Sequence, residues 1–300
     1  MKKYTGIAAS ICAAFFFGTT AAIGKLTYAH GSNPIMLTVL RGAFALPVLF
    51  VILKWLNIPL KVEKKDLRTL LIVGLLSAPA PLSLYTSFKY LTVGAGTVLQ
   101  FIFPVIVALV SAAIYKQKLN SYTIAALILS MLGVSLFYDG STSASITGFL
   151  YSMITAVSYS IYILGVGHTR LKHIHFFKIS FYFSLIWSTV AFVFAALTNQ
   201  LTFDLEPRGW LYSLIVSLFV VVVGYSMFQL GIKLTGPTTA SILSTVEPIS
   251  GNIAGIILLG ETLIVRHAIA ALIIIGGVIL VSLGTNKNRR TNHSDRPALN

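Results

Sequence analysis

Ten apolar stretches follow one another along the chain, and each is near the roughly 20 residues that an α-helix needs to cross a bilayer. They run about 6 to 25, 34 to 55, 69 to 88, 94 to 115, 121 to 138, 147 to 166, 176 to 197, 210 to 231, 238 to 259 and 265 to 284. The connections between them are short, and none could hold a soluble domain. We therefore predict an all-α integral membrane protein with ten transmembrane helices.

The distribution of charge predicts how the helices are oriented. Only 10% of the residues are charged, and Lys and Arg outnumber Asp and Glu by 22 to 8. When the loops are assigned to alternate sides of the ten spans, seventeen Lys and Arg residues fall on the side of the termini and four on the other. Because cytoplasmic loops carry the positive excess, we expect both termini in the cytoplasm, in a bacterial plasma membrane. Basic loops facing anionic lipid headgroups explain the net charge without a nucleic acid.

The two halves of the chain match at an offset of 144 residues between Lys89 and Leu136. Pro104 matches Pro248 in the fourth and ninth spans, and glycines match in the fifth and tenth. We predict two five-helix repeats at 1–138 and 147–284, a linker at 139–146 and a basic cytoplasmic tail at 285–300. An odd number of spans gives the halves opposite orientations, and such inverted repeats are typical of secondary transporters, with the substrate near the midplane.

Several short motifs resemble, in their order and spacing, the EamA-type members of the drug/metabolite transporter superfamily. They are FGTTAAIGK at 17–25, the spacing from Pro34 to Arg41, STVEPISGNIAGIILLGETL at 244–263 and GGV at 276–278. The resemblance covers nearly the whole chain and implies ten helices as two inverted five-helix repeats around a central cavity. Phe17 replaces the family's usual tryptophan, and Gln117 stands opposite Glu261 where the first repeat often has a glutamate. These departures leave the substrate open.

Glu247 is the acidic residue that lies deepest in a predicted span. It is nine residues past Thr238, or about 14 Å at 1.5 Å per residue, which is close to half of a roughly 30 Å hydrocarbon core. A carboxylate at that depth is expensive and marks a functional site by default. We predict that Glu247 couples transport to protons or binds a substrate amine; the alternative is a structural carboxylate bonded to a neighbouring helix.

Other polar and aromatic residues are candidates for a cavity around Glu247. Helical spacing puts Ala240, Ser244, Ser250 and Gly251 on its face, and the equivalent face of the fourth span carries Gly96, Gln100 and Phe103. Arg41 can bind a substrate carboxylate, pair with an acid or reach the outer headgroups. The aromatic residues Tyr159, Tyr162, Tyr182, Tyr225 and Trp187 either stack on a ligand or serve packing.

Prolines and glycines are expected to shape the helices around this cavity. Pro104 and Pro248 each free a backbone carbonyl one turn back, which either lines the cavity or bends the helix. Gly251 and Gly255 allow close helix approach, which we assign to packing within the bundle, in a monomer or a homodimer. Cys12 is interpreted as a buried, inert thiol. His168, His173 and His175 lack the regular pairing of a metal site, so we expect neither a metal nor another cofactor.

These features together favour a secondary active transporter over an enzyme. We predict an exporter of small metabolites, such as amino acids or related amphipathic compounds, that works by alternating access with protons or the substrate gradient as the driving force. The alternatives are an integral-membrane enzyme acting on a lipid and an uncoupled facilitator. A lipid enzyme would need several catalytic polar groups at headgroup level, and the sequence shows no HxxxH, DxxD or Ser/His/Asp cluster.

Overall fold

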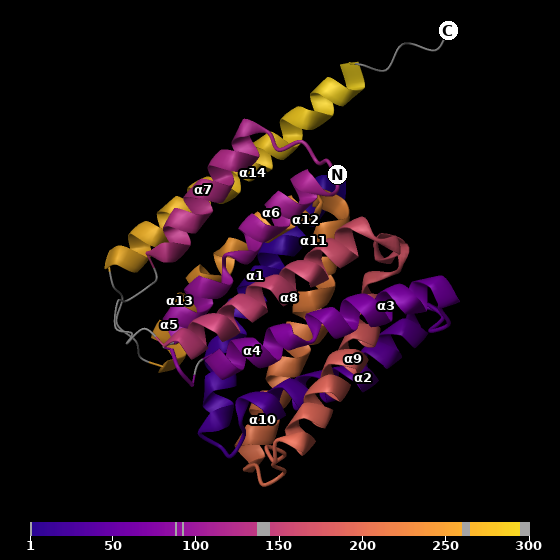
Figure 1. Cartoon of the computed structure of the whole chain (residues 1–300), viewed down its shortest axis with the longest axis vertical. Coiled ribbons are helices and arrows are strands. Elements are labelled where there is room, and N and C mark those ends of the chain that lie inside the picture. Colours follow the sequence, from indigo (N-terminus) through magenta and orange to yellow (C-terminus); the bar gives the residue numbers. More distant parts are fainter. Residues whose placement is uncertain (1, 88, 92, 137–144, 260–264, 295–300) are drawn as a thin grey trace.

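The computed structural model describes residues 2–294 apart from 88, 92, 137–144 and 260–264. All regular secondary structure in the described part of the chain is helical, and its helices form one bundle (Figure 1). Helices in one piece are α1 (Lys2–Tyr28), α2 (Pro34–Trp55), α7 (Ser121–Ser135), α8 (Ile146–His168), α9 (Phe176–Leu197) and α14 (Val265–Ser294). The prediction of an all-α membrane protein is thereby confirmed in its architecture.

Each of the remaining spans consists of two or three consecutive helical elements, divided by a short break or by a change of helix type. They are α3 (Lys64–Ser77) with α4 (Pro79–Ser87), and α5 (Val93–Gln100) with α6 (Phe103–Ala113). In the second half they are α10 (Pro207–Val216), the π-helix η2 (Ser217–Tyr225) and α11 (Ser226–Thr235), followed by α12 (Pro237–Leu243), the 3₁₀ turn η3 (Ser244–Val246) and α13 (Glu247–Leu259). A further 3₁₀ turn, η1 (Arg170–His173), joins α8 to α9.

Eight helical segments in the described residues are long and apolar enough to cross a membrane. The fourth and fifth predicted spans, 94–115 and 121–138, correspond to shorter apolar helices at Val98–Ala113 and Ser121–Ser135. The fourth is interrupted between α5 and α6, where Pro104 cannot donate the backbone hydrogen bond that would continue a helix. The chain is a multi-pass membrane protein, and the count of ten transmembrane helices stays a prediction.

Short polar side chains fix where several helices begin. Asn33 Oδ1 accepts hydrogen bonds from the backbone N–H groups of Ile35 (3.0 Å) and Met36 (2.8 Å), at the start of α2. Asn120 Oδ1 accepts from Thr123 N (2.8 Å) at the start of α7. These caps satisfy N–H groups that have no partner inside the helix. Asn33 is followed by Pro34, whose fixed φ suits the first helical position. Helix α2 therefore begins at residue 34, where the second apolar stretch of the sequence begins.

Helix α1 runs through the bundle and packs on α11, α13 and η2, whereas α7 and α14 lie side by side at one edge (Figure 1). The closest approach to α13 is at Gly18, where an added Cβ would lie 2.1 Å from Ser250 Oγ and 2.2 Å from the Glu247 carbonyl oxygen. Only a residue without a side chain fits there. The glycine in the FGTT motif therefore sets the distance between α1 and the helix that begins with Glu247.

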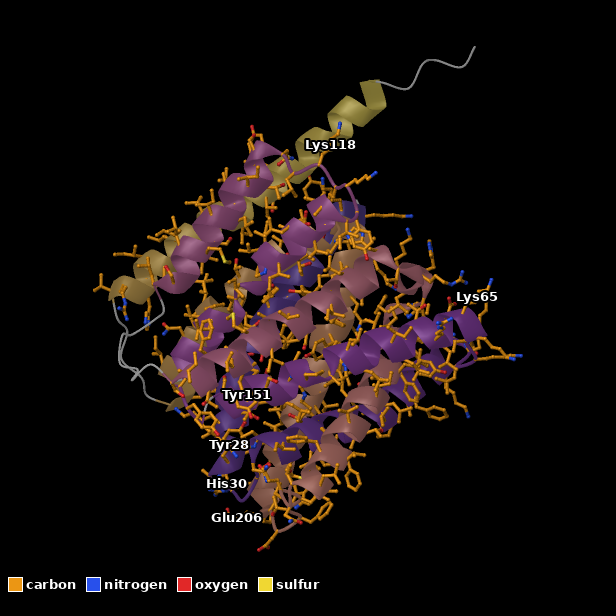
Figure 2. All side chains as sticks on the ribbon, viewed as in Figure 1. Tyr28, His30, Lys65, Lys118, Tyr151 and Glu206 are labelled. Carbon is orange, nitrogen blue, oxygen red and sulfur yellow. The ribbon has the colours of Figure 1, made fainter. Side chains whose placement is uncertain are left out.

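The two ends of the bundle differ in their polar contacts. Lys65 and Lys118 lie at one end, called the basic end below, and His30 and Glu206 lie at the opposite end, called the His30 end (Figure 2). At the His30 end, Glu206 Oε2 is 2.6 Å from His30 Nδ1, and Asn33 Nδ2 donates to the Gln200 carbonyl (2.8 Å). These bonds join the α1–α2 turn to the α9–α10 connection.

Candidate functional site

Arg41 points into the bundle between helices from both halves of the chain. Arg41 is 5% exposed. Its guanidinium lies over the rings of Tyr85 in α4 (5.8 Å to the centroid) and Tyr225 in η2 (5.9 Å). Its carbonyl oxygen accepts a hydrogen bond from Ser217 Oγ (2.6 Å), also in η2. Guanidinium–ring contacts of this kind are attractive, so the π-helix holds Arg41 by both its backbone and its charge.

The charge of Arg41 has no acidic partner among the described residues. Nη2 is buried and makes no hydrogen bond within the described part of the chain, and the salt bridges there involve other groups. A buried cation is ordinarily paired. Arg41 can therefore receive an anionic or hydrogen-bond-accepting group from a bound molecule.

Glu247 is the first residue of α13 and lies at the middle of the 22-residue span Pro237–Leu258. Its side chain is half-buried, and its carboxylate is within electrostatic range of the phenols of Tyr159 and Tyr225. No basic side chain of the described residues lies within salt-bridge distance of it. The structure thus places Glu247 at mid-span, near two of the aromatic residues that the sequence analysis selected.

Pro248 follows Glu247, and the 3₁₀ turn Ser244–Val246 comes directly before it. A proline ring removes the N–H that would bond to the carbonyl four residues earlier, that of Ser244, and a short 3₁₀ segment inside a helix is typical of such a position. Pro104 occupies the matching place after the break between α5 and α6. Both matched prolines therefore stand next to an interruption in a membrane-spanning helix.

An aromatic cluster connects the surroundings of Glu247 with those of Arg41. Ring centroids are 4.9 Å apart for Phe103 and Tyr159, 5.6 Å for Tyr159 and Tyr162, and 5.6 Å for Tyr162 and Tyr225. Trp187 lies 5.1 Å from Tyr225, but its Nε1 donates to the Gly74 carbonyl (3.0 Å). Tyr159 and Tyr225 thus lie near both charged residues, and Phe103 packs on Tyr159. Trp187 also has a packing role.

Other predicted site residues have different surroundings. Ser244 is fully buried and its Oγ donates to the Ser241 carbonyl (2.8 Å), so its hydroxyl is engaged within its own span. Ser250 Oγ donates to the Ala14 carbonyl (3.2 Å), and Gly251 faces Gly18 on α1. The face predicted to line the cavity therefore packs on α1 at these two positions, because α1 comes close to α13 at Gly18.

Gln100 is buried at the end of α5, beside the break in its span, and Gly255 is buried in α13. Tyr182 lies elsewhere, since its hydroxyl donates to the Leu60 carbonyl (2.8 Å) in the connection at the basic end. Cys12 is exposed on α1, so the expectation of a buried thiol was wrong; an apolar stretch does not say which of its residues face the lipid.

Two residues of this region were not predicted from the sequence. Tyr85 stacks on Arg41, and Gln229 in α11 is a fully buried amide near Tyr162. The signal for Gln229 was available, because an amide side chain within an apolar stretch needs a partner. Tyr85 carried no distinct pattern, as tyrosine is also common in interfacial belts.

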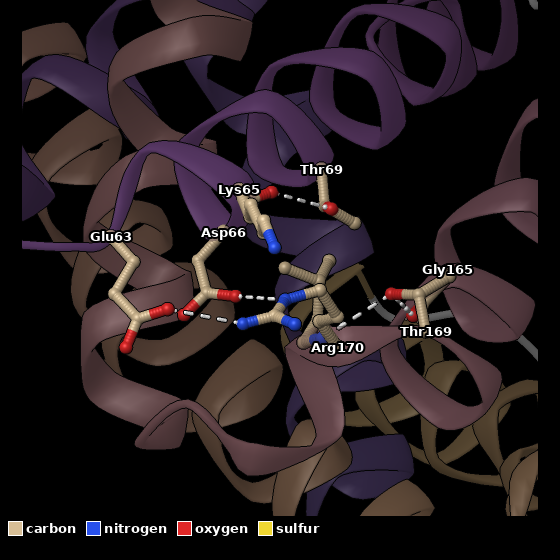
Figure 3. Close-up of polar contacts among 8 residues, drawn as sticks. Glu63, Lys65, Asp66, Thr69, Gly165, Thr169 and Arg170 are labelled. Atoms are coloured by element: carbon tan, nitrogen blue, oxygen red, sulfur yellow. Dashed lines mark hydrogen bonds and ion pairs between the residues drawn. The ribbon is translucent and has the colours of Figure 1, made fainter.

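The basic end carries a separate, open pocket of about 520 Å³, lined by Glu63, Asp66, His168, Thr169, Arg170, Lys172 and His173. Figure 3 shows Arg170 donating to Asp66 Oδ1 from Nε (2.7 Å) and to Glu63 Oε2 from Nη2 (3.1 Å). These ion pairs tie the start of α3 to η1. Because Arg170 and Glu63 are more than half exposed, water screens them and they contribute little to stability.

The histidines at this end have local partners. His168 Nε2 lies 3.2 Å from Ser111 Oγ, and its ring stacks on Tyr115. Burial and the nearby cations of Lys233 and Lys178 lower the pKa of His175, whose Nδ1 accepts a hydrogen bond from Phe177 N (3.4 Å). The neutral imidazole thus caps α9. Among the described residues, no group of three or more His, Cys, Asp or Glu side chains is placed to hold a metal ion.

A multi-pass bundle of apolar helices with charged side chains inside it defines an integral membrane protein. The model of the EamA-like transporter family matches residues 4–138 and again residues 146–283. The chain belongs to this family of membrane transporters, as the motifs indicated.

Curated relatives agree with this assignment along nearly their whole length. An "Uncharacterized transporter" of Clostridium kluyveri is 26% identical, with 96% of this chain and 95% of the relative covered. The "Uncharacterized transporter YwfM" of Bacillus subtilis is 24% identical, with 93% and 94% covered. A solved crystal structure shares the fold with a TM-score of 0.82 over 95% of this chain and 99% of that chain, at 16% identity.

Proposed function

We propose that this transporter is a secondary active exporter of small amphipathic metabolites, amino acids and related compounds, and that it works by alternating access with Glu247 coupling transport to protons. The observation that carries the proposal is a pair of charged residues inside the bundle that have no ion-pair partner. Arg41 has no acidic partner and Glu247 has no basic partner among the described residues, and both are near Tyr225. A compound with a carboxylate and an amine matches these two charges.

The internal repeat supports alternating access. The two matches of the family model meet at the connection predicted as a linker, and the matched prolines stand at interrupted spans in each half. We propose that the halves are inverted five-helix repeats of ten helices in all, with Arg41 and Tyr85 contributed by the first and Tyr225 and Glu247 by the second. A site shared between inverted halves can open to either side when one half rocks against the other.

Transport by the purified protein tests the proposal. We expect proteoliposomes loaded with a mixture of the twenty proteinogenic amino acids to release one or a few of them, faster than protein-free liposomes, and faster still with an imposed pH gradient. Mass spectrometry of the external solution measures the release. A release rate that is the same with and without the pH gradient would show that the protein is an uncoupled facilitator. Chemical change of the added lipid without solute movement would show that it is a lipid enzyme.

We propose in addition that the basic end and both termini face the cytoplasm. In a Cys12→Ser background, Lys64→Cys and Lys118→Cys should resist a membrane-impermeant thiol reagent in intact cells and react fully after permeabilisation, because positively charged loops stay on the cytoplasmic side. Glu206→Cys, at the His30 end, is the matched control that should react in intact cells. Labelling of Lys64→Cys from outside the cell would reverse the orientation.

A further inference from the structure

Gln229 is a fully buried amide that lacks hydrogen bonds. It lies in α11 with no exposed surface, and neither its Nε2 nor its Oε1 has a partner among the described residues. The hydroxyl of Tyr162, on α8, is buried and unpartnered in the same way. The amide lies within electrostatic range of this hydroxyl, although neither group meets the distance and angle of a hydrogen bond with any described residue.

Such an arrangement is unfavourable for a side chain that serves packing alone. An unsatisfied buried polar group loses its bonds to water and gains nothing in return, whereas an apolar residue of the same shape is neutral or better. Here both an amide and a hydroxyl have lost their hydrogen bonds to water in the middle of an apolar bundle. Their polar atoms are therefore suited to a partner that is present in only part of the transport cycle.

The position of Gln229 indicates what that partner is. Tyr225, Gln229 and Lys233 follow one another at intervals of four residues, which places them on one face of the helix, about 6 Å apart per step. Tyr225 contacts Arg41 at the central site. Lys233 donates a hydrogen bond to the Ile174 carbonyl, in the α8–α9 connection at the basic end. Gln229 thus stands midway between the central site and the basic end.

We propose that Gln229 and Tyr162 line the passage between the central site and the basic end, and that they hydrogen-bond the polar groups of a small solute moving through it. The inference rests on the proposed transport function and extends its site toward one end of the bundle. In the conformation described, α11 packs against α8 and α9 and the passage is closed, since Phe228 and Ile232 are fully or almost fully buried around Gln229.

Thiol accessibility tests the passage without knowledge of the substrate. In a Cys12→Ser background, Gln229→Cys should react with a small membrane-impermeant methanethiosulfonate applied from the basic end, at least about tenfold faster than Ile232→Cys. Ile232 is equally buried on the same helix but apolar, so it reports general loosening of α11. Lys118→Cys, which is exposed, identifies the side from which the reagent arrives. Equal rates for Gln229→Cys and Ile232→Cys, or no reaction of either, would overturn the inference.

A second variant separates transport from packing. Gln229→Leu removes the unsatisfied amide, so we expect the melting temperature of the purified protein to stay the same or rise. Amino-acid release from proteoliposomes should nevertheless fall at least about tenfold, the equivalent of about 1.4 kcal/mol of lost interaction with the solute. If the wild type releases amino acids and Gln229→Leu releases them equally fast, the passage is refuted and the proposed function stands. If the wild type releases none, the proposed function itself is refuted.

Discussion

Replacing Glu247 with Gln should abolish proton-driven accumulation while leaving the fold nearly intact. Glutamine keeps the shape and the hydrogen-bonding capacity of the side chain, but its amide does not take up or release a proton. A transporter that exchanges one proton for each solute can reach a gradient of about tenfold per unit of pH difference, because one pH unit is worth about 1.36 kcal/mol. We expect the variant to reach no gradient beyond equal concentrations, as measured by solute content of proteoliposomes with an imposed pH gradient.

The same variant distinguishes the two roles that the sequence leaves open for this carboxylate. If Glu247 carries only the proton, exchange of labelled for unlabelled amino acid at equal concentrations should survive in Glu247→Gln. If it binds a substrate amine, exchange should be lost together with accumulation. Glu206→Gln is a suitable control, because Glu206 is a carboxylate at the exposed His30 end with a 64% exposed side chain. An unchanged rate and pH dependence in Glu247→Gln would show that the residue is structural.

The depth of Glu247 could be predicted from the sequence because it depends only on the rise of a helix and the thickness of a bilayer. Its angular surroundings could not. One regular helix was expected from Thr238 to Gly251, whereas a 3₁₀ turn ends at Val246 and changes the rotation between Ser244 and Glu247. Ser250 and Gly251 keep their helical spacing from Glu247 within α13, yet they meet α1, because packing decides which helix covers a face. The aromatic groups near the carboxylate come from α8 and η2.

The family and the helical class could be predicted because apolar stretches, matched prolines and motif spacing are local properties of the chain. The contacts of Arg41 depend on positions far apart in the sequence. Its neighbour Tyr225 is placed by a nine-residue π-helix, a rare structure that is frequent at functional sites and has no simple sequence signal. The exposure of Cys12 and the partners of Tyr85 likewise follow from how helices pack, which periodicity alone does not give.

Replacing Arg41 with Met should weaken substrate binding more than it weakens the protein. A hydrogen bond to a charged group contributes about 1.5–3 kcal/mol, and each 1.4 kcal/mol is about tenfold in affinity. The KM for an exported amino acid should therefore rise about tenfold to more than a hundredfold. Because the guanidinium has no acidic partner in the described residues, an apolar residue of similar length should leave the melting temperature unchanged or raised.

Two comparisons show whether the lost interaction is the one with a substrate carboxylate. Arg41→Lys keeps the charge but loses the planar fork and the stacking on Tyr85 and Tyr225, so its KM should lie between those of the wild type and Arg41→Met. Arg170→Met removes an exposed arginine at the basic end and should leave KM unchanged. Competition by the amine that results from decarboxylating the same amino acid should be equally weak in the wild type and in Arg41→Met, because this amine has nothing for Arg41 to bind. A lower melting temperature with an unchanged KM in Arg41→Met would instead assign Arg41 to packing, and the anionic half of the proposed site would then have to be sought elsewhere in the bundle.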